Sequence, residues 1–212
     1  MAFHIGDADA HGNALHDLGE VARGIFRRQQ RELRARCRGD AFHHALNGIG
    51  EGIYFNLGML SMDSKDTVSA EKWFRKAVDT KPDFRSALFN LALLLSETGR
   101  AMEGAPFLKT LLWHNPDHVK GLILLGDLYV NHLRDLPSAE RCYRHILKVE
   151  PDNIQAQHNL CVVMVEAGDL PLARDCLRDT LSRAPDEEYI AKHLSIVEER
   201  LQQAFTLSLP DN

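Results

Sequence analysis

The sequence predicts an all-α protein built from helical hairpins that repeat along the chain. Four prolines carry this prediction, because they recur at intervals of 34, 35 and 34 residues and an aspartate follows each one: Pro82, Pro116, Pro151 and Pro185. Proline has no amide hydrogen and disfavours helix in the residue before it. Each Pro-Asp pair is therefore expected to end one helix, and its aspartate to accept hydrogen bonds from the first amides of the next. A repeat of this length is typical of hairpins stacked in series.

A second pattern lies between the prolines and indicates where the two helices of each hairpin meet. A leucine followed by a small residue marks the first helix, and an alanine opens the second. The pairs are Leu57-Gly58, Leu91-Ala92, Leu125-Gly126 and Leu160-Cys161, and the alanines are Ala70, Ala105, Ala139 and Ala173. The distance between packed helices depends on the side chains at their contact. We therefore expect a small-residue contact at Gly58 and Ala70, and we expect Gly126 to face the second helix of its hairpin near Ala139.

These patterns divide the chain into four hairpins, a final helix and two terminal segments. The hairpins are expected at 51–84, 85–118, 119–153 and 154–187, followed by a capping helix at 188–205 and a tail at 206–212. The third hairpin has one extra residue, which we place in the turn at 132–135, because turns absorb insertions most cheaply. The final helix has no second partner, so we expect it to cover the apolar face of the fourth hairpin.

Residues 1–50 do not fit the repeat and form an arginine-rich extension whose fold the sequence does not determine. Their seven arginines begin at Arg23 and end at Arg38. A basic helix here could contact nucleic acid or lipid headgroups, but no aromatic residue interleaves with the arginines after Phe26, so we favour a solvated helix face. The whole chain has a formal charge of −5, which gives no overall attraction to nucleic acid or anionic membrane. We therefore expect no nucleic-acid partner.

Several other classes of site and segment have no support in the sequence. No run of about 18 apolar residues occurs, so no membrane span is expected, and the first residues have neither a basic nor an apolar leader segment. The histidines lack metal-binding spacing, and no catalytic motif stands out, so we predict neither a metal site nor a catalytic residue. The four cysteines show no CxxC spacing and are predicted to be buried thiols, with a Cys142–Cys161 bridge as the alternative: they are Cys37, Cys142, Cys161 and Cys176.

The leucine and small-residue pairs, the alanines and the closing prolines together resemble the tetratricopeptide repeat. Five stretches narrow the resemblance further. They read IYFNLGML at 53–60, DFRSALFNLA at 83–92, DHVKGLIL at 117–124, HNLCVV at 158–163 and APDEEYI at 184–190. Over about residues 51–203 the chain is similar to the C-terminal repeats of the transmembrane and tetratricopeptide-repeat O-mannosyltransferases.

The resemblance implies a role in the endoplasmic reticulum. Members of that family transfer mannose from dolichol-phosphate-mannose to Ser or Thr of cadherin-type domains, a multi-span part supplies the chemistry, and the lumenal repeats engage protein. This chain has no span and none of the acidic lumenal-loop site, so no catalytic residue carries over and no cofactor is expected in it. We expect it to be part of a longer protein. The alternative, if the chain is complete as written, is a cytoplasmic adaptor or scaffold with no glycosylation role.

The first helices of such repeats line the inner face of a superhelix, where a protein or peptide partner can bind. The candidate groove residues are Asn56, Asn90, Asn159, Phe55, Phe89, Lys120, Asp127 and His158. The three asparagines each stand one residue before the packed leucine, although Leu124 interrupts the series. An amide both donates and accepts hydrogen bonds, so such a ladder could hold a peptide backbone, and it resembles the asparagine ladder of the intracellular O-GlcNAc transferase.

Two other interpretations of these positions remain open. The asparagines could simply face water. A clamp for a terminal carboxylate, as in chaperone-binding repeats, needs basic and amide side chains on successive inner faces. Only Asn90 and Lys120 match that pattern, so the clamp is not the leading hypothesis.

Overall fold

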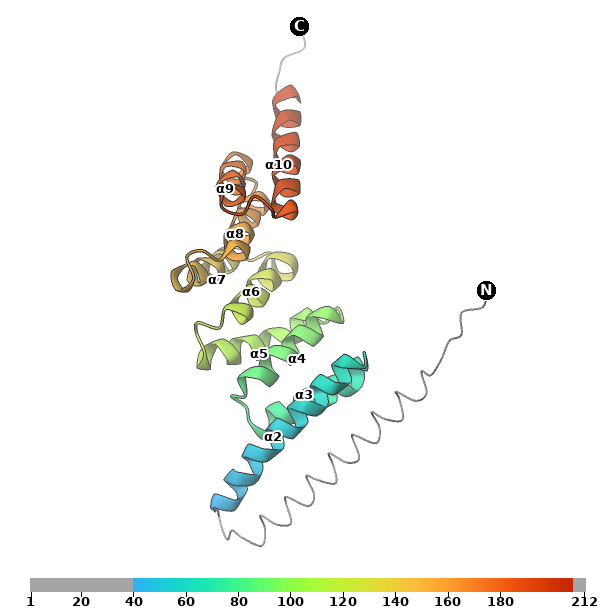
Figure 1. Ribbon diagram of the computed structural model, residues 1–212. Helices are drawn as coiled ribbons and strands as arrows, with labels where there is room; N and C mark the ends of the chain where they lie inside the picture. Colours follow the sequence, from blue (N-terminus) through green and yellow to red (C-terminus); the bar gives the residue numbers. More distant parts are fainter. Residues whose placement is uncertain (1–39, 208–212) are drawn as a thin grey trace, which may run out of the picture. The chain divides into compact units, whose positions relative to one another are not determined.

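The computed structural model describes residues 40–207, which consist of helices joined by short turns (Figure 1). The chain divides into two compact units, Met1–Arg100 and Ala101–Asn212, and each is described by itself. The boundary falls between the two helices of the hairpin expected at 85–118. The arginine-rich segment lies outside the described residues.

The first unit contains three described helices. They are α2 (Asp40–Asp63), α3 (Thr67–Thr80) and α4 (Arg85–Glu97). Helix α2 packs against α3, and α3 packs against α4. Helix α2 begins at Asp40, inside the segment that the repeat pattern left unassigned. The core of this unit includes Phe74 and Leu91, which are fully buried.

The second unit continues the same alternation of helices. It contains α5 (Ala101–His114), α6 (Val119–Leu128), the π-helical η1 (Tyr129–Leu133), α7 (Leu136–Val149), α8 (Ile154–Glu166), α9 (Leu170–Arg183) and α10 (Glu188–Leu207). Each helix packs against the next one along the chain. The all-helical repeat fold expected from the prolines is therefore confirmed.

The Pro-Asp pairs shape the turns between hairpins, but their aspartates do not cap helices. At each turn the amide after the aspartate donates to the carbonyl before the proline, as His118 does to Asn115 at 3.1 Å. Proline and aspartate thus occupy the two central positions of a β-turn, where proline's fixed φ is favoured at the first. The helix starts one residue too late for aspartate to cap it, and His118 and Asn153 accept the free amides instead. The predicted capping role was wrong.

Aspartate caps the second helix of the hairpins instead. The side chains of Asp66, Asp135 and Asp169 each accept a hydrogen bond from the backbone amide three residues ahead. Hydrogen bonds to the charged form favour ionisation, so the pKa values of Asp66 and Asp135 lie below the ordinary aspartate value.

The extra residue of the third hairpin lies in a π-helical segment and not in an open turn. Residues Tyr129–Leu133 continue α6 with a wider winding, and Arg134 then adopts a left-handed backbone with φ of 54°. The amide of Asp135 closes the segment by donating to the carbonyl of Tyr129 at 3.0 Å. A π-helical turn accommodates one additional residue within a helix. The predicted turn at 132–135 therefore overlaps the insertion but misplaces its start.

Glycine allows close approach within the hairpins, and the nearest side chain at two of these glycines is an aromatic ring. A Cβ added to Gly126 would lie 2.7 Å from the ring of Tyr143, and one added to Gly58 would lie 2.4 Å from the ring of Phe74. Both rings are buried, with Tyr143 only 1% exposed. Gly126 therefore faces the second helix of its hairpin, as expected, and each ring stands four residues after the alanine that opens that helix.

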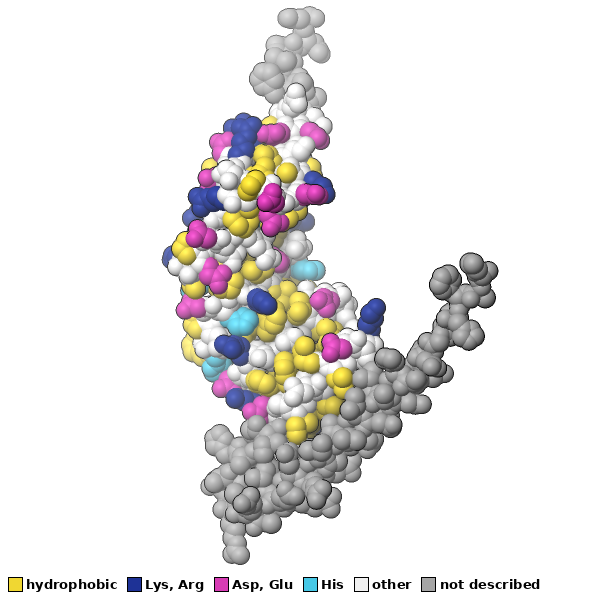
Figure 2. Space-filling model, viewed as in Figure 1, with side chains coloured by type: hydrophobic (Ala, Val, Ile, Leu, Met, Phe, Trp, Pro, Cys, Tyr) yellow, Lys and Arg dark blue, Asp and Glu magenta, His cyan; other side chains and the backbone are white. Residues whose placement is uncertain are grey.

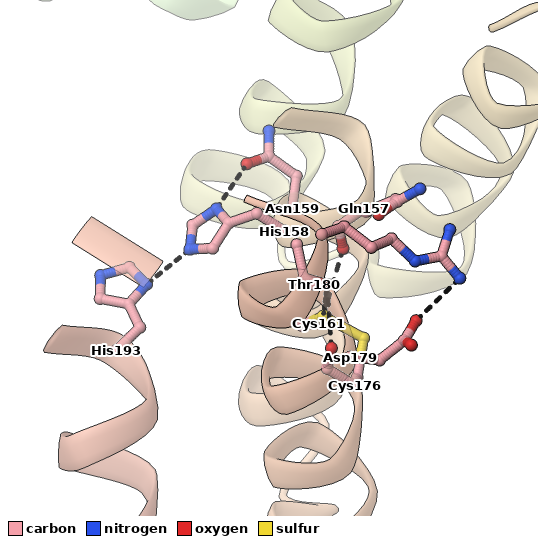
Figure 3. The surroundings of a disulfide bond; sticks show 9 residues. Gln157, His158, Asn159, Cys161, Cys176, Asp179, Thr180 and His193 are labelled. Carbon is pink, nitrogen blue, oxygen red and sulfur yellow. Dashed lines mark hydrogen bonds and ion pairs between the residues drawn. A yellow bond between two sulfur atoms is a disulfide. The ribbon is translucent and has the colours of Figure 1, made fainter. Parts of the chain in front are cut away.

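A disulfide closes the fourth hairpin at the equivalent place. Cys161 of α8 and Cys176 of α9 are bonded, with their Cα atoms 5.6 Å apart (Figure 3). The prediction of buried thiols was wrong for these two residues, and the alternative Cys142–Cys161 bridge does not form. The prediction of a buried thiol was confirmed for Cys142, which is free and buried. Its pKa rises to about 11 because burial disfavours the thiolate. Cys37 lies outside the described residues.

Helix α10 covers the fourth hairpin, as expected of a cap. Its Ile190 and Val197 are buried in one apolar cluster with Cys161, Ala173 and Leu177. The helix runs two residues beyond the expected end at 205, to Leu207. An ion pair of 2.5 Å between Arg178 of α9 and Glu198 of α10 adds a polar contact at the edge of this cluster.

The close contact at Gly126 yields a stability prediction. Gly126→Leu places a branched side chain where Tyr143 already lies, so we expect the variant to lose about 1–3 kcal/mol of unfolding free energy by overpacking. The matched control is Gly52→Ala in α2, where an added Cβ meets nothing within 4 Å. Thermal and urea denaturation measure both changes. A wild-type midpoint for Gly126→Leu would contradict the assigned contact.

The disulfide yields a second prediction. It closes a loop with a sequence separation of 15 residues, and a crosslink of that size stabilises by about 3 kcal/mol in the chain-entropy model. We expect dithiothreitol to lower the unfolding midpoint of the wild type. The double variant Cys161→Ala/Cys176→Ala should melt lower and show no further response to the reductant. A wild-type midpoint that reduction leaves unchanged would rule out a stabilising bridge.

Candidate functional site

The predicted groove residues of the first unit split into exposed and packed side chains. Asn56 is exposed and makes no hydrogen bond to another described residue. Asn90 donates to the carbonyl of Ser86, one turn earlier on its own helix, at 2.8 Å. Phe55 packs against the rings of Phe74 and Phe84, with centroid separations of 5.8 and 5.4 Å, so it supports the hairpin. Phe89 is half-buried.

In the second unit the structure brings Asp127 and Asn159 together around Tyr143. The Tyr143 hydroxyl donates to Asp127 Oδ1 at 2.7 Å, and Asn159 Nδ2 donates to the same oxygen at 3.0 Å. Asp127 belongs to α6 and Asn159 to α8, so this oxygen links two successive first helices. The predicted asparagine is thus held by a neighbouring carboxylate.

The predicted His158 is buried and extends the same network toward α10. One of its ring nitrogens lies 3.3 Å from Asn159 Oδ1, and the other lies 2.8 Å from His193 Nδ1 (Figure 3). The ring of Tyr189 meets His158 edge-on, with centroids 4.9 Å apart. The polar contacts therefore run from Tyr143 through Asp127, Asn159 and His158 to His193.

Burial shifts the ionisation of three groups in this network. The pKa of Asp127 is raised because burial penalises the carboxylate, although the hydrogen bond from Tyr143 acts the other way. The pKa of Tyr143 is also raised, first by burial and then by the charge of Asp127. The pKa of His158 is lowered by burial and by the neighbouring His193. The network thus favours the neutral form of the His158 ring.

A pocket of about 180 Å³ opens beside the network between α8 and α10. Its lining is mostly aliphatic and comprises Val162, Val165, Glu166, Leu177, His193, Ile196 and Val197. Ile196 is 51% exposed, so the pocket presents apolar surface to solvent. Such a cavity with a few polar groups at hand suits an aliphatic side chain of a ligand.

Of two charged side chains on α6 and α8, one forms an ion pair with a described residue and the other does not. Lys120 is exposed and forms no ion pair with a described residue. Glu166 pairs with Arg134 at 2.7 Å, which joins α8 to the end of η1. Over the face drawn in Figure 2, acidic and basic side chains alternate among hydrophobic ones, with no large patch of one sign. Electrostatic attraction of a strongly charged partner to this face is therefore not expected.

Sequence reasoning did not identify Tyr143, His193 or the pocket as parts of the site. The repeat register contained a signal for some of them. His193 precedes Leu194 as Asn159 precedes Leu160, and Ile196 and Val162 each stand two residues after these leucines. Extending the register into the last helix would have placed these side chains on the inner face. Tyr143 carried no such signal, because it lies on a second helix.

Other classes of site find no support in the part of the chain that the structure describes. No group of three or more His, Cys, Asp or Glu among residues 40–207 could hold a metal ion. No helix there is both long and apolar enough to cross a bilayer.

The histidine contact yields a prediction on pH dependence. Because the pKa of His158 is lowered in the folded chain, the folded state binds fewer protons than the unfolded one, and acid favours unfolding. We expect the unfolding free energy to fall as the pH drops from about 7.5 to about 5.5, through the ordinary histidine value. His158→Gln should weaken this dependence, whereas His132→Gln, at an exposed position of η1, should leave it intact. An equal acid loss in both variants would contradict the role of His158.

Comparison with known proteins finds homologues over most of the chain. The model described as tetratricopeptide repeat matches residues 52–84. Protein O-mannosyl-transferase Tmtc3 of Drosophila melanogaster is 56% identical over 153 residues, which cover 72% of this chain and 16% of that protein. TMTC3 of Homo sapiens is 50% identical over 197 residues, covering 91% and 21%, and TMTC3 of Mus musculus is 44% identical over 203 residues, covering 93% and 22%. The chain thus spans about a fifth of the length of these curated relatives.

Solved structures of other proteins support the fold and nothing further. A tetratricopeptide repeat protein from Parabacteroides merdae has a TM-score of 0.68 and 20% identity, covering 95% of this chain and 80% of that one. The MamA protein has a TM-score of 0.66 and 16% identity, covering 72% and 82%. Together, the repeat match and the identity over most of the chain show that it is a homologue of the TMTC3-family protein O-mannosyltransferases and contains their tetratricopeptide repeats.

Proposed function

We propose that this repeat region binds an extended segment of an acceptor polypeptide for an O-mannosyltransferase. The acceptor lies on the inner faces of the first helices, and the part of the full protein that transfers mannose lies outside this chain. Family membership supports a role in mannosylation in the endoplasmic reticulum. The observation that carries the binding proposal is the recurrence of an asparagine one residue before the packed leucine, at Asn56, Asn90 and Asn159.

The amide groups retain hydrogen-bonding capacity for a ligand. Asn56 is exposed, and its side chain makes no hydrogen bond to another described residue. Asn90 uses one donor, to Ser86, and its side-chain oxygen accepts no hydrogen bond from a described residue. An extended backbone presents both N–H and C=O groups along its length, so an amide side chain can pair with it whatever the sequence of the ligand. Recognition of this kind suits an enzyme region that meets many acceptor sequences.

The disulfide supports a lumenal site of action. Disulfides form and persist in oxidising compartments such as the lumen of the endoplasmic reticulum and are rare in the cytosol. The bridge between Cys161 and Cys176 therefore favours lumenal repeats over the cytoplasmic adaptor. Cadherin-type domains are the acceptors that the family resemblance implies, and their β-strands supply extended segments that carry Ser and Thr.

The binding proposal is tested by titrating an extended cadherin-strand peptide against the wild type and asparagine variants. Each Asn→Ala change removes about 0.5–1.5 kcal/mol of net hydrogen bonding, so Asn56→Ala/Asn90→Ala/Asn159→Ala should weaken binding by roughly ten- to several-hundred-fold. The single variant Asn56→Ala is the cleanest probe, because this side chain has no hydrogen bond within the described residues to lose. Circular dichroism and thermal melting check that folding is retained.

The control Lys120→Glu separates the ladder from the carboxylate clamp. A backbone ladder should tolerate this change, whereas a clamp on a terminal carboxylate should lose most of its affinity. Equal binding by the wild type and the triple asparagine variant would eliminate the ladder. A large loss confined to Lys120→Glu would favour the clamp.

A further inference from the structure

We infer that the Ala101–Asn212 unit selects extended peptides that carry a basic side chain and an aliphatic side chain at an even spacing. The basic group pairs with Asp127, and the aliphatic group enters the pocket between α8 and α10. This inference rests on the proposed function and specifies the class of ligand.

Asp127 is a carboxylate held in place without a counter-charge. Its Oδ1 accepts hydrogen bonds from Tyr143 and Asn159, which fix the orientation of the group. It forms no ion pair with any described residue, and its Oδ2 accepts no hydrogen bond from one. By contrast, the exposed Glu166 nearby is neutralised by Arg134.

A half-buried carboxylate without a cation is costly, because its loss of hydration is not offset by an opposite charge. A lysine or arginine of the ligand would supply that charge at Oδ2 and form a charge-assisted hydrogen bond. The raised pKa of Asp127 agrees with this view, since a nearby cation would lower it again. Lys120 does not fill the role, because it lies seven residues earlier on α6, roughly 10 Å along the helix axis.

The pocket provides the second contact and accepts a different kind of side chain. Five of its seven lining residues are aliphatic. Its two ionisable residues are already engaged, Glu166 with Arg134 and His193 with His158. An aliphatic side chain entering the pocket would bury apolar surface, including that of the half-exposed Ile196, at about 25 cal/mol per Å². The pocket therefore favours Val, Leu or Ile over a charged side chain.

The repeat register places the two contacts at corresponding positions of three helices. Asp127, Val162 and Ile196 each stand two residues after the packed leucine of α6, α8 and α10. Direct side-chain contacts join α6 to α8 and α8 to α10, so these helices are neighbours. A ligand that reaches both contacts therefore crosses from α6 to the pocket between α8 and α10.

Alternate side chains of an extended peptide point to the same face, so those at positions i and i+4 share a face and those at i and i+3 do not. One ligand can therefore reach both contacts only with an even spacing between its basic and its aliphatic side chain. Either order along the peptide satisfies this geometry.

The test uses blocked peptides rich in Thr and Ser that contain one Lys and one Leu, four or six residues apart in either order. Matched peptides replace Lys with norleucine, replace Leu with Ala, or shorten the spacing to three. They are titrated against the full chain, Asp127→Asn, Ile196→Ser and the control Asp175→Asn, which changes an exposed carboxylate of α9. Asn at position 127 can still accept from Tyr143 and Asn159, so folding should be preserved.

We expect the wild type and the control to prefer Lys over norleucine by about tenfold or more, the worth of one hydrogen bond to a charged group. Asp127→Asn should abolish that preference, and Ile196→Ser should reduce the preference for Leu over Ala. Spacing of three should lose one of the two contacts.

The possible failures are distinguishable. A preference for Lys that persists in Asp127→Asn overturns the inference while leaving peptide binding intact. Suppose that the Asn→Ala variants lose peptide binding but Asp127→Asn leaves the preference for Lys unchanged. This result supports the proposed function and overturns only the inferred selection of a basic side chain. Absence of binding by all peptides to every form overturns both.

Discussion

The close contact between the two helices of a hairpin is the constraint on which the rest of this structure depends. In the third hairpin Gly126 leaves room for the buried ring of Tyr143. Because the ring lies across that glycine, its hydroxyl reaches Asp127, the next residue on α6. The same glycine that lets the hairpin close thus positions a polar group at the inner face. Gly126, which sets the helix packing, and Asp127, a candidate binding residue, are thus adjacent on α6.

In three hairpins, a different pair of residues forms the close contact between the first and the second helix. Gly58 faces Phe74, Gly126 faces Tyr143, and Cys161 is bonded to Cys176. A glycine and a ring fill the space by shape, whereas two cysteines fill it with a covalent bond. Cys142 stands three residues after Ala139 just as Cys176 stands three after Ala173, but Gly126 offers it no thiol. It is therefore a buried free thiol in the same structural position.

The fold was predictable because it depends on periodic features. The spacing of the prolines fixed the number and order of the hairpins, and the leucine and small-residue pairs located their contacts. The helix caps were not predictable from this period, since whether Asp117 or His118 caps α6 depends on where a β-turn ends and the helix begins. The disulfide was missed because its cysteines lie within one hairpin, whereas the bridge considered joined neighbouring ones.

Much of the candidate site also follows from the period, and the remainder requires three-dimensional contacts. Asp127, Asn159 and His158 were placed by register, and the structure joins them in one network. Their partners were not foreseen. Tyr143 belongs to a second helix, and His193 belongs to a final helix that was interpreted only as a cap. A side chain's partner on another helix depends on rotamer and tilt, which a single sequence does not encode in its spacing.

The π-helical segment at the end of α6 bears on how a repeat array tolerates changes in length. One additional residue is absorbed by a wider turn over Tyr129–Leu133, and the left-handed Arg134 then redirects the chain into α7. The later helices pack in the same order as those of the other hairpins, so the insertion is contained where it occurs. The redirected Arg134 also reaches Glu166 on α8. The segment that holds the additional residue thus also connects neighbouring hairpins, and a fixed 34-residue period would misalign every position that follows it.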